Sequence, residues 1–147
     1  MLHDFSENAI DLIKRHEGFS PTAYYCPGNK LTIGYGHVLK NKLDRTITVD
    51  EANDLLNYDL ISLEKQLNKL LTINKIQLNQ NQYDAIISFV FNIGITKFKN
   101  STLFKHLKNN DFLKAALEFN KWIYASGKIQ QGLVKRREAE ASLFIRF

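Results

Sequence analysis

Apolar residues near the N-terminus recur at the spacing of an amphipathic helix. Ser6 is placed to cap the start of this helix, and Gly18 is placed to end it. The pattern therefore predicts a helix between these two residues. The positions that share its 3.6-residue period are Phe5, Ala9, Leu12, Ile13 and His16.

The pattern changes over residues 19–47, where short β-favouring segments alternate with turn-forming residues. Apolar and aromatic side chains favour strands at residues 23–25, 31–35 and 46–47. We therefore expect a small, twisted antiparallel sheet of two or three strands, in a lobe spanning about residues 18–47. The prolines and glycines that separate the segments are Pro21, Pro27, Gly28, Gly34 and Gly36.

Helical periodicity returns at Thr48, which forms a capping-box pattern with Glu51. A helix of about 24 residues is predicted over residues 48–71, long enough to link two lobes. Its apolar face comprises Ala52, Leu55, Leu56, Leu63, Leu67 and Leu70.

The remaining chain is predicted to be helical. Asn79 and Gln82 mark the start of a helix whose residues 85–91 are apolar nearly all round, which is typical of a buried helix. Further helices are expected after Ser101, after Asp111 and over residues 133–145, with Trp122 in the core between them.

These elements predict one domain, residues 1–147, of the α+β class and mostly helical. The small sheet lobe is expected to be joined by the long helix to a helical lobe. That helical lobe comprises about residues 60–147 together with the N-terminal helix. A cleft between two lobes is the usual place for a ligand.

Composition and charge narrow the functional classes. The chain is 44% hydrophobic and 24% charged, as in a globular domain with a packed core. Its net charge of +5 favours a polyanionic partner, either nucleic acid, anionic lipid or a cell-wall polymer, although so modest a charge needs no partner. RNP-type strands and zinc-finger spacings are absent from the sequence, so we expect no nucleic-acid partner.

Cysteine usage and hydropathy set further expectations. Cys26 is the only cysteine, which excludes a disulfide within the chain. Apolar runs fall short of the roughly 20 residues of a membrane span, and the N-terminus lacks the pattern of a secretory signal. We therefore expect no stable membrane anchor.

Three chemically capable residues border the predicted sheet. Glu17 ends the first predicted helix, Cys26 follows nine positions later, and Thr32 six positions after that. Hydrolysis of a glycosidic bond needs a proton donor and a second group that handles water or developing positive charge across the sugar ring. Taken singly, the three could equally be a surface carboxylate, a bystander thiol and a strand threonine.

Taken together, they resemble a known constellation. Glu17, eight residues, Cys26, five residues and Thr32 are similar to the catalytic triad of phage-type lysozymes, the endolysins of glycoside hydrolase family 24. The middle position of that triad is aspartate or, in some members, cysteine. The segment HEGFSPTAYYCPGNKLTIGYGH resembles the family's active-site segment. The stretches TVDEANDLLNYDL, NQYDAIISFVFNIG and GLVKRREAEASLF extend the resemblance over nearly the whole chain.

The resemblance implies hydrolysis of the β-1,4 bond between N-acetylmuramic acid and N-acetylglucosamine in bacterial peptidoglycan, with lysis of the host cell. It makes Glu17 the general acid, with Cys26 and Thr32 handling the water or the developing positive charge, and it favours inversion. It implies no metal and no cofactor. It also implies a monomer that stays in the host cytoplasm until a separate holin releases it to the wall.

Secondary site residues each have a structural alternative. Tyr35 and Gly36 are expected to contact the sugar, or else to form a tight hairpin. Asn92 and Gly94 are expected to line the opposite wall of the cleft, or else simply to end a helix. His37 is expected to be structural, paired with a carboxylate or a backbone group.

Two arginines near the C-terminus complete the candidate site. Arg136 or Arg137 is expected to reach across to Glu17 or to carboxylates of the substrate, and Arg137 is the one we assign to substrate binding. The alternative is a solvated helix face.

Three other functional classes stay open at this point. A metal-dependent amidase would use zinc-ligand types, of which the chain offers His16, Glu17, Cys26 and His37, although their spacing matches no familiar zinc pattern. A thiol hydrolase would pair Cys26 with His37. A non-catalytic wall-binding module would need neither.

Overall fold

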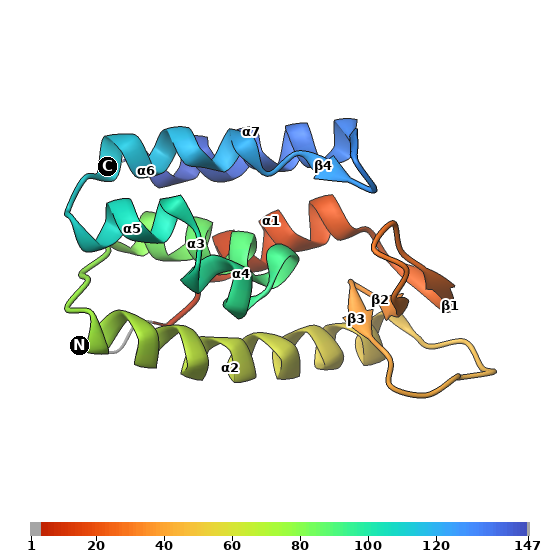
Figure 1. Cartoon of the computed structure of the whole chain (residues 1–147). Coiled ribbons are helices and arrows are strands. Elements are labelled where there is room, and N and C mark those ends of the chain that lie inside the picture. The colour runs from red at the N-terminus through yellow and green to blue at the C-terminus, as the bar shows by residue number, and fades with distance from the viewer. Residues whose placement is uncertain (1–3, 147) are drawn as a thin grey trace.

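The computed structural model describes residues 4–146 and has a helical body with a small sheet at one end (Figure 1). Helix α1 (Glu7–Glu17) lies where both sequence signals place it. The Ser6 side chain accepts a hydrogen bond from the Asn8 backbone N–H, and Gly18 ends the helix with φ +71°. Ala9, Leu12 and Ile13 form the buried face of α1.

The sheet contains three antiparallel strands in the order β1-β2-β3. They are β1 (Ser20–Tyr25), β2 (Leu31–Gly34) and β3 (His37–Val38). Tyr24 pairs with Thr32, and Ile33 pairs with His37. The small antiparallel sheet was therefore predicted correctly.

The strand predicted at residues 46–47 is wrong, because the third strand is β3. The Ile47 backbone N–H donates to the Pro21 carbonyl at 2.9 Å, outside any strand ladder. The Ile47 side chain is apolar because it packs with Ile33 and Ala52 in a small hydrophobic cluster between the sheet and α2. The sequence pattern of this buried loop residue is therefore the same as that of a strand residue.

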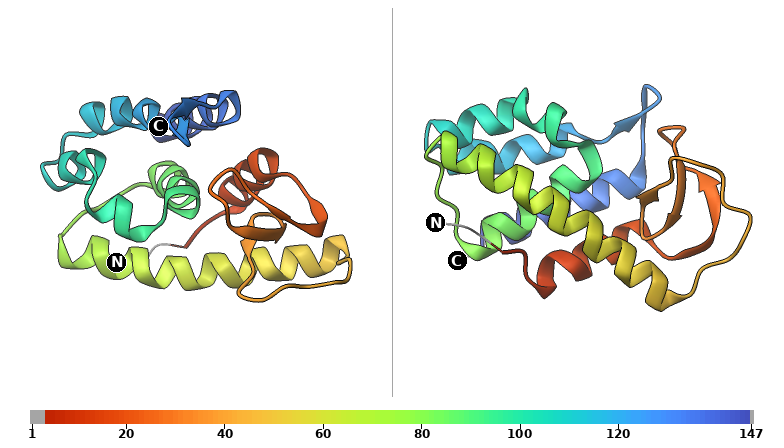
Figure 2. Two further views of the ribbon diagram at one scale, coloured as in Figure 1. Left: turned by 45° about the vertical axis from the view of Figure 1, so that its right-hand side comes forward. Right: turned by 90° about the horizontal axis from the view of Figure 1, so that it is seen from below.

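Helix α2 (Val49–Ile73) is 25 residues long and runs along the molecule from the sheet to the far end of the helical body (Figures 1 and 2). Both hydrogen bonds of the predicted capping box between Thr48 and Glu51 are present. Because α2 contributes Ala52 to the cluster under the sheet and Leu67 to the main core, it connects the two hydrophobic clusters.

Helix α3 (Gln80–Ile93) is the buried centre of the helical body, as predicted. Eight consecutive residues, 83–90, are buried, and the capping box of Asn79 and Gln82 is formed. Helix α7 (Gln131–Phe144) packs along α3, starting two residues before the predicted position. The half-buried Trp122 packs edge-on against Phe89, with ring centroids 5.7 Å apart.

Shorter elements complete the chain. The predicted helices after Ser101 and Asp111 are α5 (Thr102–Lys108) and α6 (Phe112–Glu118). Helix α4 (Ile95–Lys99), the 3-10 helix η1 (Phe119–Lys121) and the hairpin of β4 (Tyr124–Ala125) and β5 (Lys128–Ile129) were not predicted. Within residues 4–146, each helix is too short or too polar to span a membrane.

Candidate active site

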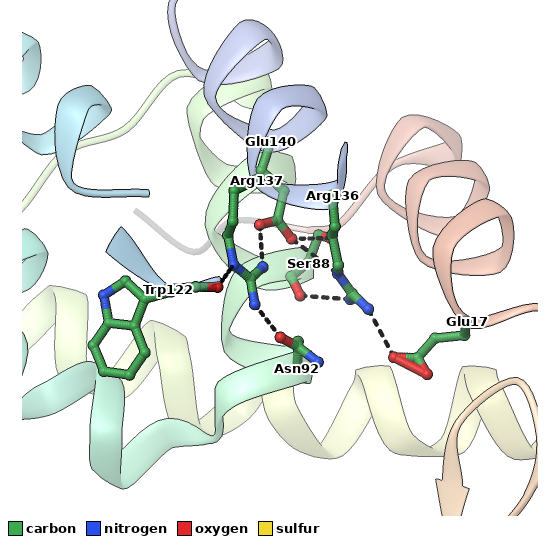
Figure 3. Close-up of polar contacts among 7 residues, drawn as sticks. All are labelled: Glu17, Ser88, Asn92, Trp122, Arg136, Arg137 and Glu140. Atoms are coloured by element: carbon green, nitrogen blue, oxygen red, sulfur yellow. Dashed lines mark hydrogen bonds and ion pairs between the residues drawn. The ribbon is translucent and has the colours of Figure 1, made fainter. Parts of the chain in front are cut away.

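Glu17 is the last residue of α1, and Gly18 turns the chain directly into the sheet. The Glu17 side chain is 18% exposed, and its Oε1 accepts a hydrogen bond from Nη1 of Arg136 at 2.7 Å (Figure 3). The expectation that one of the two arginines reaches Glu17 is confirmed, and Arg136 is that residue.

Gly36 lies against the other oxygen of Glu17. A Cβ at position 36 would stand 2.6 Å from Oε2, closer than Cβ atoms approach any neighbour, and the backbone φ of +75° also favours glycine. The geometry shows Gly36 making room for the Glu17 carboxylate. Its expected contact with sugar stays a prediction.

Substituting Gly36 by alanine should therefore lower kcat by at least about tenfold, because the new methyl group displaces Oε2 of Glu17. Gly127→Ala is the matched control, since its φ is also +75° but nothing lies within 4 Å of the added Cβ. Lysis assays and thermal unfolding of both variants separate the two effects. Equal activity losses in the two would show that backbone strain, and not contact with Glu17, is responsible.

Cys26 begins the turn that joins β1 to β2. Its backbone N–H donates to the Lys30 carbonyl at 3.0 Å, and its own carbonyl accepts from the Asn29 N–H at 2.8 Å. Burial raises the pKa of the Cys26 thiol, but hydrogen bonding to the Lys30 backbone, the Thr32 hydroxyl and the Gly28 backbone outweighs burial and lowers the pKa below its ordinary value. The sulfur thus sits among donors that favour the thiolate.

Thr32 lies beside Cys26 in the central strand. The Thr32 residue is 3% exposed, and its hydroxyl donates to the Lys30 carbonyl at 2.8 Å. The one hydroxyl hydrogen can turn toward this carbonyl or toward the Cys26 sulfur, while the oxygen keeps lone pairs that can accept a hydrogen bond.

Tyr24 lies near the three predicted catalytic residues. It pairs with Thr32 across the ladder, so both side chains lie on one face of the sheet. Burial raises the pKa of the Tyr24 phenol, and the negative charges of Glu17 and Cys26 raise it further. Glu17 and Cys26 therefore both lie near enough to Tyr24 to disfavour its ionised form, and Thr32 shares its face of the sheet.

His37 lies on the opposite face of the sheet from Thr32. It pairs with Ile33, the neighbour of Thr32 in β2, and successive side chains of a strand point to opposite faces. Its Nδ1 is 2.8 Å from Oδ2 of Asp59 on α2, which confirms the expected pairing with a carboxylate. This geometry does not support a Cys26–His37 dyad.

The side chain of Arg137 is 1% exposed, which does not fit the predicted contact with substrate. Its Nε donates to the Trp122 carbonyl at 2.8 Å, its Nη2 donates to Oδ1 of Asn92, and its guanidinium stacks 4.9 Å from the Phe89 ring centroid. Arg137 therefore joins α7 to α3 in the interior of the protein. The packing of α7 against α3 buries the face of α7 that carries Arg137, and the sequence pattern did not show that this face is buried.

The other predicted contact residues have structural partners of their own. Asn92 holds Arg137, and Gly94 ends α3 with its N–H donating to the Val90 carbonyl at 2.8 Å. The Tyr35 ring lies 5.7 Å from the Phe19 ring, with the Lys14 ammonium 5.2 Å from its centroid. Sugar contacts by Tyr35, Asn92 and Gly94 stay predictions.

Two residues of this region were missed in the sequence. Glu140 is completely buried, and its carboxylate bonds Ser88, Arg136 and Arg137 (Figure 3). The sequence did carry a signal for each residue. Arg136 and Glu140 are four residues apart in a predicted helix, a spacing that pairs side chains, and Ser88 is a hydroxyl residue within the apolar run of another predicted helix, where it needs a hydrogen-bond partner.

The two surface hollows lie away from the predicted triad. Two surface hollows, of about 260 and 300 Å³, flank α1 against α2 and α7, and neither is lined by Glu17, Cys26 or Thr32. Within the described part of the chain, no three His, Cys, Asp or Glu side chains gather as metal ligands would.

Comparison with known proteins places this chain in a family. Residues 14–140 match the Phage lysozyme family model. The chain is 44% identical over 143 residues to the endolysin of Acyrthosiphon pisum secondary endosymbiont phage 1, covering 95% of this chain and 96% of that protein. It is 41% identical over 145 residues to the endolysin of Bacillus phage B103, covering 97% of this chain but only about half, 54%, of the longer relative.

A solved structure gives the same result for the fold. The muramidase domain of SpmX from Asticaccaulis excentricus superposes with a TM-score of 0.86 at 32% identity, covering 98% of this chain and 99% of that domain. The family model spans the end of α1 that carries Glu17, the whole three-stranded sheet and most of α7, and the chain belongs to the phage lysozyme family.

Proposed function

We propose that this protein is an endolysin that hydrolyses the β-1,4 bond between N-acetylmuramic acid and N-acetylglucosamine in bacterial peptidoglycan and so lyses the host cell. The names of its relatives, endolysins and a muramidase domain, support this substrate. The observation that carries the proposal is the Glu17 carboxyl, which has Oε1 held by Arg136 and Oε2 facing the side-chain-free Gly36.

Glu17 acts as the general acid in this proposal. Because Oε1 accepts a hydrogen bond from Arg136, the proton for the leaving oxygen is carried on Oε2. The sugar chain lies between the sheet and the helical body, the cleft expected from the sequence, with the scissile oxygen within reach of Oε2. Gly36 leaves the space that the Glu17 carboxyl occupies in this position.

Cys26 and Thr32 handle the water. The Thr32 oxygen accepts one hydrogen bond from it, and the Cys26 sulfur, whose backbone and hydroxyl neighbours favour the thiolate form, accepts the other. The water then attacks the anomeric carbon from the face opposite the leaving group, so the reaction inverts the configuration. The assignment matches the family's pattern with cysteine at the middle position of the triad.

The cellular context follows from the same resemblance. We infer a monomer that waits in the host cytoplasm and reaches the wall after a separate holin permeabilises the membrane. The net charge of +5 suits an anionic wall polymer.

Mass analysis of digested peptidoglycan tests the proposed bond. New reducing ends at N-acetylmuramic acid are expected, and proton NMR of the fresh product should show the α-anomer first, as inversion of a β-bond requires. Reducing ends at N-acetylglucosamine, or new peptide termini as an amidase or a thiol hydrolase would leave, would refute the proposal.

A further inference from the structure

Glu140 is a buried carboxylate to which the catalytic proposal gives no role. It is 0% exposed in the middle of α7, between the guanidinium groups of Arg136 and Arg137, whose side chains are 3% and 1% exposed. Burying two like charges side by side is costly unless a counter-charge lies between them. Burial lowers the pKa of Arg137, and the adjacent Glu140 opposes that shift.

The contacts of Glu140 fix the direction in which Arg136 points. Oε2 of Glu140 accepts from Nε of Arg136 at 3.2 Å and from the Ser88 hydroxyl at 2.6 Å. Nη2 of Arg136 donates to the Ser88 carbonyl at 2.9 Å. Because a guanidinium is a rigid planar fork, holding Nε and Nη2 leaves Nη1 only one direction, and that direction leads to Oε1 of Glu17 (Figure 3).

Other ionisable groups around Glu17 contribute less charge. Burial lowers the pKa of His16 on α1, and Arg136 lowers it further, so His16 is neutral at pH 7. The raised pKa keeps Tyr24 on β1 neutral as well. On the α7 side, Glu17 faces the guanidiniums of Arg136 and Arg137, and Glu140 is the buried carboxylate paired with both of them.

We propose that Glu140 is a positioning residue for catalysis: it orients Arg136 and balances its charge, and through Arg136 it sets the position of the Glu17 carboxyl and the charge beside it. This inference rests on Glu17 being the general acid of the proposed function. Glu140 touches no substrate, and its effect passes through one intermediate side chain.

Glu140→Gln tests the proposal, because it keeps the shape of the side chain and removes its charge. With the charge unbalanced, the positive potential favours ionised Glu17, so the alkaline limb of the pH–kcat profile should move to lower pH. Misplacement of Glu17 should lower kcat by about 10- to 100-fold, with KM changed less than about twofold.

Asp84→Asn is the matched control. Asp84 is also 0% exposed, but it bonds Ser6 and Gln80, away from Arg136. This variant should lose thermal stability while keeping the wild-type kcat and pH profile. In the Arg136→Gln background, Glu140→Gln should lower kcat by less than about twofold more, because its route to Glu17 is already cut.

The outcomes separate the two proposals. A Glu140→Gln profile whose limb stays in place or moves to higher pH, or a full additional loss in the Arg136→Gln background, overturns the positioning role. If Glu140→Gln does not fold, Glu140→Asp replaces it, because this variant keeps the charge on a shorter side chain. It should lower kcat several-fold and leave the alkaline limb of the pH–kcat profile in place. A wild-type kcat in Glu140→Asp would overturn the positioning role. An active Glu17→Gln variant would instead overturn the proposed function.

Discussion

Glu17→Gln should lower turnover on peptidoglycan by at least about 10², because the amide cannot give a proton to the leaving oxygen. The fold should survive this change. The amide oxygen can still accept the hydrogen bond from Arg136, and the shape of the side chain beside Gly36 is nearly the same. Initial rates of wall lysis and product release by chromatography measure the loss.

Glu138→Gln is the matched control for Glu17→Gln. Glu138 is an exposed residue of α7, so the same chemical change there should leave the rate unaltered. Circular dichroism of both variants should match the wild type. Lysis by Glu17→Gln within a few-fold of the wild-type rate would leave the non-catalytic wall-binding module as the better reading.

The residues that were predictable from the sequence owe their positions to local physics. Thr48 with Glu51 placed the start of α2 within one residue, because a capping box is complete within four residues. The apolar run of α3 predicted its burial, because a helix without a polar face is stable only when it is buried on all sides.

The elements that were missed are short or depend on tertiary packing. The hairpin of β4 and β5 turns at Ser126 and Gly127, with φ +53° and +75°, the geometry of a two-residue type I′ turn. Strands of two residues are too short to show a periodic pattern, so the Ser126-Gly127 pair was the only sign of this hairpin in the sequence. Ile47 was misassigned for the opposite reason, since its apolar side chain reports burial and not a strand.

The residues of the candidate site also differ in how far the sequence predicted them, depending on whether they lie in a local motif or are placed by tertiary packing. The resemblance to the phage-type lysozyme triad indicated Glu17, Cys26 and Thr32, and it could be recognised because the motif lies within 16 residues, from one helix end through one hairpin. The choice between Arg136 and Arg137 was not decidable from sequence. The two are adjacent on α7, and only the packing of α7 against α1 and α3 directs one toward Glu17 and the other toward Asn92.

Cys26→Ala should lower turnover by about 10² if the sulfur holds the attacking water. The stability cost should be below about 1 kcal/mol, because Cys26 is only half-buried at the edge of a turn and its deletion opens no core cavity. Thermal unfolding and steady-state lysis rates of the same preparation measure the two effects together.

Cys26→Asp should stay active, and the structure gives the reason. The groups that surround the sulfur, the backbone of Lys30 and Gly28 and the hydroxyl of Thr32, stabilise a negative charge whether a thiolate or a carboxylate carries it. An aspartate is ionised at pH 7 and can accept the same hydrogen bond from water. Activity of Cys26→Asp beside inactivity of Cys26→Ala would show that the position needs an acceptor and not a thiol.

Alkylation of Cys26 reports directly on its ionisation. Because no other cysteine exists in the chain, the rate of reaction with iodoacetamide measures this thiol alone. Its pH midpoint should lie below that of an ordinary thiol, and Thr32→Val, which removes one hydrogen-bonding neighbour, should raise the pKa of Cys26 and move the midpoint to higher pH. Loss of activity on alkylation of Cys26 is ambiguous by itself, because the added group would exclude the sugar from the site whatever the role of the sulfur. The turnover of Cys26→Ala therefore decides: a wild-type rate would make the thiol a spectator and leave a water held by Thr32, with Glu17, to carry the reaction.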